Sequence, residues 1–204
     1  MKKIIGVTAL AVSLFVSPHA SEAANETFQD VPKTHSSYEA ITWTANQGIV
    51  SGSNGKFNPG GTLTEKQFIK MYAEFFKFPK SANESTTSKD WSDAYYERLA
   101  AFNAPVQGTT NKTLRSQPLT RGTFAQLIAF AHGQPADPVS ATKYLMKEGI
   151  SSGQNLQETD PLKRFGAANT LTRAQAATFL FRMSQNGQNQ IAPAVLKGKA
   201  STTT

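Results

Sequence analysis

Two arginines stand directly after a threonine in segments of similar sequence, at Thr120-Arg121 and Thr172-Arg173. A threonine before an apolar helical pattern is typical of a helix N-cap, so each arginine lies beside the unpaired N–H groups of a first turn. The positive end of a helix attracts anions, and a guanidinium adds a planar pair of donors that matches a carboxylate. The pattern predicts that Arg121 and Arg173 bind an anion, with solvated surface arginines as the alternative.

The residue types that enzymes use most often are sparse in this chain. There is no cysteine, which excludes disulfides and thiolate metal sites. His35 and His132 have no metal-ligand spacing, and no nucleophile-elbow sequence is present. Asp30, Asp137 and Glu148 could be proposed as a carboxylate pair for glycoside hydrolysis, but surface or capping positions are the better interpretation. The sequence therefore predicts a binding protein without a metal or cofactor, and not an enzyme.

A Leu-Thr segment occurs three times, each time after a segment that ends in glycine. The glycine and threonine pairs are Gly52 and Thr64, Gly108 and Thr120, and Gly153 and Thr172. The first two spacings are 12 positions and the third is 19, so the third copy carries an insertion of 7 residues. Matched spacing with related sequence indicates three internal repeats.

An apolar stripe follows each threonine at positions 4, 7, 8 and 11, which lie on one face of a helix. These predicted core residues are Phe68, Met71, Tyr72, Phe75, Phe124, Leu127, Ile128, Ala131, Ala176, Phe179, Leu180 and Met183. Thr64 with Gln67, and Thr172 with Gln175, have the spacing of a capping box, which Thr120 lacks.

A second helical pattern precedes each glycine segment, so each repeat is predicted to be helix, loop, helix. The patterns run over Tyr38, Ile41 and Ala45, over Tyr95, Leu99 and Phe102, and over Ala141, Tyr144 and Leu145. Gly48 and Gly149 are placed to end the first and third of these helices in a left-handed conformation. Ala104-Pro105 is expected to end the second by a different means.

Residues 1–23 have the three parts of an export signal, with Lys2 and Lys3, an apolar stretch, and small residues up to Ala23. The stretch is shorter than the roughly 20 residues of a membrane span, which disfavours a retained anchor. We expect a secreted protein with no membrane segment after signal removal. The rest divides into repeats at 24–80, 81–134 and 135–185, and a flexible polar tail at 186–204 that buries little surface.

The chain carries a moderate positive charge. Without Lys2, Lys3 and Glu22, the formal charge of +7 becomes +6, from 19 basic and 13 acidic residues. This excess could favour anionic partners such as wall polymers, nucleic acid or lipid head groups. Because the basic residues are scattered, a solvated positive surface is the simpler interpretation, and nucleic acid is not a predicted partner.

Taken together, these segments resemble the S-layer homology family over roughly residues 27–184. Its repeats start with Phe-x-Asp-Val, which residues 28–31 match, and continue through a Gly-Ile-x-x-Gly turn to a Thr-Arg-Ala-Glu helix start. The resemblance implies a mainly α fold with three helix-loop-helix repeats in one pseudo-threefold helical bundle. It also implies attachment to the cell wall, through grooves between repeats that bind secondary cell-wall polysaccharide, often ending in a pyruvylated amino sugar.

The resemblance carries a set of groove residues onto this chain. The candidate polysaccharide-binding residues are Arg121, Arg173, Asp30, Asp137, Gly52, Gly108, Gly153 and Trp91. The glycines would let the backbone approach a sugar closely. Trp91 is a candidate stacking platform, with a core tryptophan as the favoured alternative.

The first and second repeats depart from the family pattern. Glu65 stands in place of the arginine, and Lys66 points about 100° away on an ideal helix, so this position is not expected to bind an anion unless Lys66 substitutes. The second repeat lacks the Gly-Ile pair, and either Asp90 or Asp93 could align with the family aspartate or cap a helix. These departures keep a second function open, a divergent assembly or interaction protein without sugar binding. Its partners would be S-layer or other surface proteins.

Overall fold

The computed structural model describes residues 28–80, 84 and 87–198, so the predicted export signal lies outside the described residues. The regular elements are α1 (Tyr38–Asn46), α2 (Glu65–Phe75), α3 (Asp93–Ala100), η1 (Gln107–Thr109), η2 (Lys112–Ser116), α4 (Arg121–Ala131), α5 (Pro138–Lys147), α6 (Pro161–Phe165), α7 (Arg173–Gln185) and α8 (Pro193–Lys197). The fold is mainly α, as predicted, and extended pairing within these ranges is limited to isolated bridges. None of the helices in the described ranges has both the length and the apolar character of a bilayer span.

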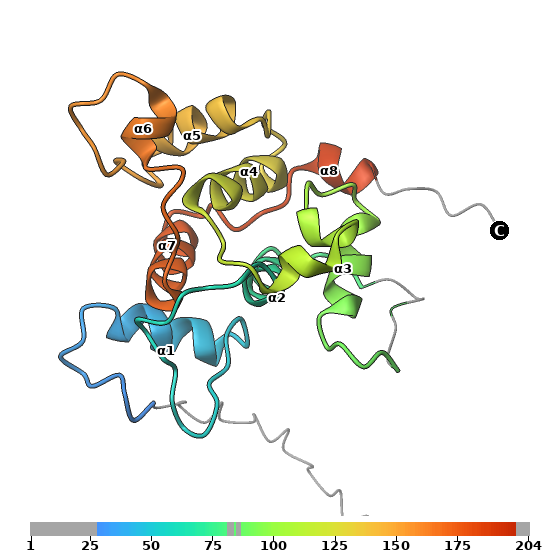
Figure 1. The fold of residues 1–204 in the computed structure, drawn as a ribbon, viewed down its shortest axis with the longest axis vertical. Coiled ribbons are helices and arrows are strands. Elements are labelled where there is room, and N and C mark those ends of the chain that lie inside the picture. The colour runs from blue at the N-terminus through green and yellow to red at the C-terminus, as the bar shows by residue number, and fades with distance from the viewer. Residues whose placement is uncertain (1–27, 81–83, 85–86, 199–204) are drawn as a thin grey trace, which may run out of the picture.

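The helices that follow the three threonines each pack against a shorter helix. α2 packs against α3, α4 against α5, and α7 against α1. Figure 1 shows these three pairs spreading outward from a common centre. The partner of each longer helix is therefore the first helix of the next predicted repeat, and α7 returns to the first repeat.

A closed ring of backbone hydrogen bonds lies at the starts of the longer helices. Leu63 N–H donates to Leu171 O at 2.9 Å, and Leu171 N–H donates to Leu119 O at 3.1 Å. Leu119 N–H completes the ring by donating to Leu63 O at 2.8 Å. All three leucine side chains are buried. Because each segment gives one bond and accepts one, the ring holds the first residues of α2, α4 and α7 at fixed positions around one centre.

The predicted apolar stripe forms the core, with one exception. All of its residues are buried except Phe179, which is half-buried. Phe68 and Phe124 lie with ring centroids 5.3 Å apart, and burying a phenylalanine of this kind stabilises the fold by roughly 1.5–3 kcal/mol. Tyr72 satisfies its buried hydroxyl by donating to Leu127 O at 2.8 Å.

The helix ends follow the sequence closely, with one substitute that we did not predict. Gly48 and Gly149 end α1 and α5 with φ of 71° and 69°, as expected. After α3 the left-handed residue is Asn103, with φ of 58°, and Ala104 N–H donates to Leu99 O at 3.2 Å. Asparagine tolerates this conformation better than other residues with a side chain, so it replaces glycine here.

The tail contains a short helix that was not predicted. Its described part, residues 186–198, contains α8, and Val195 is buried in the core. Ala192 N–H donates to Ala131 O at 2.8 Å, and His132 Nε2 lies 3.0 Å from Gln188 O. Most residues of this part are exposed, so it buries little surface as predicted, but a few apolar residues dock α8, which the sequence did not predict because it has no long periodic pattern.

Candidate ligand-binding pocket

A pocket of about 410 Å³ lies where the start of α7 meets the turn between α1 and α2. The turn contributes residues 49–53 and 56–58, and α2 contributes the side of the helix that carries Lys70 and Met71. Arg173 lines the pocket from α7, and Trp91 lines it from the segment before α3. Four separate parts of the chain therefore converge on it, and we call it the Arg173 pocket.

Arg173 is the first residue of α7 and is half-buried. Its Nε donates to Phe57 O at 2.8 Å, and its Nη2 donates to Ser51 O at 2.9 Å. The guanidinium carbon lies 4.5 Å from the Phe57 ring centroid. Burial lowers the pKa of Arg173, and the Asp30 carboxylate acts in the opposite direction. The ion pairs found among the described residues do not include Arg173, so its charge has no directly bonded carboxylate there.

Asp30 holds the turn that Arg173 contacts. Its two carboxylate oxygens accept from Phe57 N–H at 2.8 Å and from Asn58 N–H at 2.7 Å. Burial raises the pKa of Asp30, but the backbone N–H groups of Phe57, Asn58 and Asp30 itself, together with the charge of Lys56, outweigh it, so the net shift is below the usual value. Because both oxygens are used by the turn, the structure gives Asp30 a positioning task beside the pocket.

Lys70 and Trp91 form the outer part of the pocket. Lys70 Nζ donates to Ser51 Oγ at 3.1 Å. Trp91 is 50% exposed, and Lys66 Nζ lies 5.9 Å from its ring centroid. The interpretation of Trp91 as a core residue is therefore wrong, because Tyr96 and the inner face of α3 fill the core instead.

Gly52 lies on the pocket wall, and its lack of a side chain is required by the turn. A Cβ atom there would lie 2.5 Å from Cε1 of Phe28 and 2.6 Å from Lys56 O. Ser53 N–H also donates to Lys56 O at 2.9 Å, which closes the turn tightly. Close packing of the turn on itself thus explains this glycine without any ligand.

Arg121 has the same bonding pattern as Arg173 but lies in a closed environment. It is the first residue of α4, and its Nε donates to Phe165 O at 3.1 Å while its Nη2 donates to Ser151 Oγ at 3.2 Å. Its guanidinium carbon lies 4.8 Å from the Phe165 ring centroid and 5.4 Å from that of Phe179. The residue is 5% exposed, and burial lowers its pKa. Gly153, with φ of 87°, lies in the turn next to it.

We call each place where the first residue of α2, α4 or α7 contacts a segment elsewhere in the chain a junction. Glu65, the first residue of α2, occupies the third junction. Its Oε1 accepts from Gly108 N–H at 2.7 Å and from Tyr96 Oη–H at 2.9 Å. A Cβ atom on Gly108 would lie 2.4 Å from this oxygen, so Glu65 covers Gly108. The buried Arg115 donates from Nε to Gly108 O at 2.8 Å. Sequence reasoning missed Arg115, since no motif or spacing connects it to Glu65.

The remaining candidate aspartates lie away from the pocket. Asp137 is the N-cap of α5, where its Oδ1 accepts from Ser140 N–H at 3.0 Å, and its side chain does not join any of the three junctions. Asp93 pairs with Arg115 and, at 3.3 Å, with Lys112 Nζ. These carboxylates stabilise local structure, and no cluster of three His, Asp or Glu in the described part of the chain could hold a metal.

A family model covers one part of the chain. Residues 27–69 match the S-layer homology domain. The matched segment carries Asp30, Gly52 and Glu65, and it supplies the turn and the first part of α2 that line the Arg173 pocket, whereas Lys70 and Met71 lie just beyond it. S-layer homology domains are binding modules of the cell surface, so the match supports surface or wall attachment in general. No curated protein matches the chain significantly.

Proposed function

We propose that the protein attaches non-covalently to the bacterial cell wall by binding an acidic secondary cell-wall polysaccharide in the Arg173 pocket. The single observation that carries the proposal is the half-buried Arg173 guanidinium, which borders a pocket and has no carboxylate bonded to it among the described residues. Lys56 and Lys70 line the same pocket, and the N-terminal end of α7 adds positive potential.

The geometry favours a sugar that carries a carboxylate. Two guanidinium nitrogens of Arg173 already donate to Phe57 O and Ser51 O, which fixes the plane of the group. A fixed guanidinium beside Lys70 would bind a carboxylate, such as that of a pyruvate ketal, with charge-assisted hydrogen bonds. Trp91 offers an exposed apolar face at the pocket edge for the ring of the same or a neighbouring sugar.

We further propose that the module consists of three repeats, at 24–80, 81–134 and 135–185, around a pseudo-threefold axis, behind an export signal at 1–23. The closed leucine ring and the three helix pairs support this arrangement. So does the first residue of each longer helix: Glu65, Arg121 and Arg173 each reach into the turn of the next repeat.

A second candidate function is a surface assembly or interaction protein without sugar binding. The specific observation in its favour is that two of the three junctions are filled by the protein's own side chains, at Arg121 and at Glu65. This candidate predicts binding to surface proteins that does not depend on the polysaccharide.

Sedimentation with purified cell walls separates the two candidates. The protein should sediment with walls that retain their secondary polysaccharide and remain in solution with walls from which it has been stripped chemically. Free polysaccharide, added in excess, should release the bound protein. Equal sedimentation with both wall preparations, or with neither, would count against polysaccharide attachment.

A further inference from the structure

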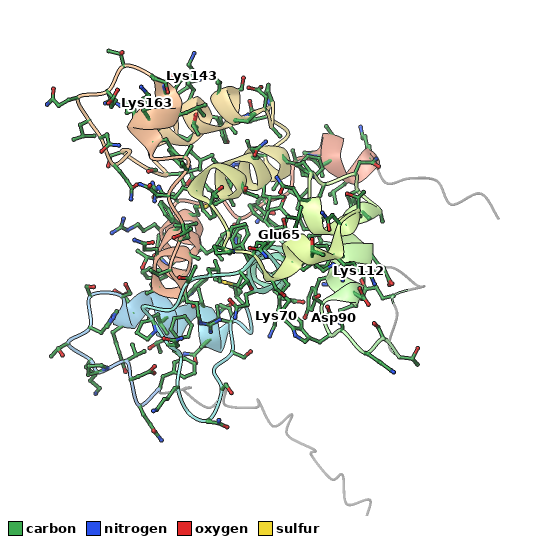
Figure 2. All side chains as sticks on the ribbon, in the orientation of Figure 1. Glu65, Lys70, Asp90, Lys112, Lys143 and Lys163 are labelled. Carbon is green, nitrogen blue, oxygen red and sulfur yellow. The ribbon has the colours of Figure 1, made fainter. Side chains whose placement is uncertain are left out.

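Glu65 presents a carboxylate at its junction, whereas Arg121 and Arg173 present guanidinium groups at theirs. Its side chain is 5% exposed, and Figure 2 places it in the interior of the molecule, beside α3. Lys143 and Lys163, in contrast, lie at the outer edge of the α5 and α6 region. A buried carboxylate is costly unless donors surround it, so its partners decide what this junction does.

The groups that act on Glu65 come from α3, η1 and η2. Gly108 N–H and Tyr96 Oη–H both donate to its Oε1. Arg115 adds a buried positive charge, stacks 3.9 Å from the Tyr96 ring centroid and is fixed by Gly108 O and Asp93. Burial raises the pKa of Glu65, whereas Tyr96, Gly108 and Arg115 act to lower it, so these groups offset part of the desolvation.

A backbone N–H and a phenol that donate to one carboxylate, with the charge of a buried guanidinium nearby, form an acid-binding site. We propose that this junction is a carboxylate site that the chain fills with its own Glu65, leaving the Arg173 pocket as the one junction of the three where an external acid exchanges. The first half of this inference is independent of wall binding, and the second half rests on the proposed function. The Arg121 junction takes no part in exchange, because Phe165 and Phe179 cover its guanidinium.

Chemical rescue tests the first half directly. Glu65→Ala removes the carboxylate and leaves its donors unpaired, so the Tm should fall by roughly 4–8 °C. Sodium formate at about 100 mM supplies a carboxylate of the right size and should raise the Tm of this variant by roughly 2–4 °C more than the same concentration of sodium chloride. Wild-type protein in the two salts gives the baseline, which includes any formate bound in the Arg173 pocket, and the response of Glu65→Ala should exceed this baseline.

Two control variants separate rescue from general salt effects. Glu65→Gln keeps the side-chain volume, so its formate response should not exceed that of the wild type. Glu39→Ala removes an exposed first-turn carboxylate from α1 and should lose little stability and respond to formate as the wild type does. A formate response of equal size in Glu65→Gln or Glu39→Ala would overturn the inference, as would a response in Glu65→Ala no larger than that of the wild type.

If Glu65→Ala does not fold in chloride, refolding from urea gives the readout. Helical circular dichroism that returns in formate but not in chloride would support the inference, and no return in either salt would contradict it. Titration of the wild-type protein with a soluble polysaccharide fragment then tests the second half, which predicts one site per chain. Two or three sites would overturn that half alone, whereas formate rescue without any polysaccharide binding would reject the proposed function and leave the Glu65 site standing.

Discussion

Arg173 and Arg121 start equivalent helices and make equivalent hydrogen bonds, yet one borders a pocket and the other is sealed. Each donates from Nε to a phenylalanine carbonyl and from Nη2 to a serine oxygen. The difference lies in one side chain on the helix that covers each junction, seven positions after the N-cap threonine of that helix. That residue is Met71 on α2 beside Arg173, and Phe179 on α7 over Arg121.

This comparison separates two properties that a repeat motif combines. The Thr-Arg pair fixes the guanidinium at a helix start and gives it acceptors in the neighbouring turn. Whether a ligand can reach it is decided by side chains elsewhere, such as Met71, Phe179 and the Phe165 of α6. A matching motif therefore indicates a guanidinium held at a fixed position but does not by itself indicate an accessible site.

The largest expected effect is on stability at the sealed junction. Arg121→Ala should lower the free energy of unfolding by roughly 2–4 kcal/mol, because it leaves a cavity between Phe165 and Phe179 and removes the donors to Phe165 O and Ser151. Urea denaturation measures this change. Retention of the folded variant on walls should stay unchanged. A loss below about 1 kcal/mol, or a loss of wall binding in the folded variant, would mean that the two junctions do not differ as described.

Met71→Phe should make the Arg173 pocket resemble the sealed junction at Arg121. The larger ring would enter the Arg173 pocket, so affinity for walls should fall about tenfold, while overpacking costs roughly 1–3 kcal/mol of stability. Met146→Phe, on α5 and away from the pocket, is the matched control and should keep full affinity. Wall-binding isotherms provide the measurement, and equal affinity of the two variants would break the comparison.

Trp91→Ala should weaken wall binding by roughly threefold to tenfold, because it removes an exposed apolar face at the pocket edge. Its Tm should change by less than about 2 °C, since half of the side chain is already in solvent. Phenylalanine at this position should restore most of the affinity. Unaltered binding by Trp91→Ala would show that the tryptophan is not part of the binding site.

The smallest expected effect concerns pH. The folded-state pKa of Asp30 lies below its usual value, so its carboxylate contributes stability above the unfolded pKa of about 3.9, and that contribution is lost as the pH falls through the folded pKa. Asp30→Asn should therefore be less stable than the wild type near neutral pH, with the gap closing at acidic pH. Urea titrations across this range measure the gap, and a gap that does not depend on pH would contradict the carboxylate's part in holding the turn.

Local signals in the sequence predicted the parts of the fold that depend on few neighbours. The apolar spacing after Thr64, Thr120 and Thr172 marked the core helices, and Gly48 and Gly149 marked two helix ends. These features follow from backbone geometry and from burial of one helix face, which a single chain segment displays.

Long-range partners were beyond the reach of the sequence. Arg115 influences Glu65 only because η2 packs against α2, and the Val195 docking depends on a surface that several helices build together. Exposure was also unpredictable, since Trp91, favoured as a core residue, is 50% exposed, and Arg121, predicted to bind an anion, is 5% exposed. The structure places the Asp137 carboxylate at the N-cap of α5, where a local backbone N–H occupies it.

Wall binding by Arg173→Ala tests the central claim most directly. The account predicts that this variant loses affinity for polysaccharide-bearing walls by roughly tenfold to a hundredfold, with helical circular dichroism intact. Arg182→Ala, an exposed arginine in the last turn of the same helix, should bind as the wild type does. If both arginine variants keep wild-type affinity, the Arg173 pocket is not the attachment site.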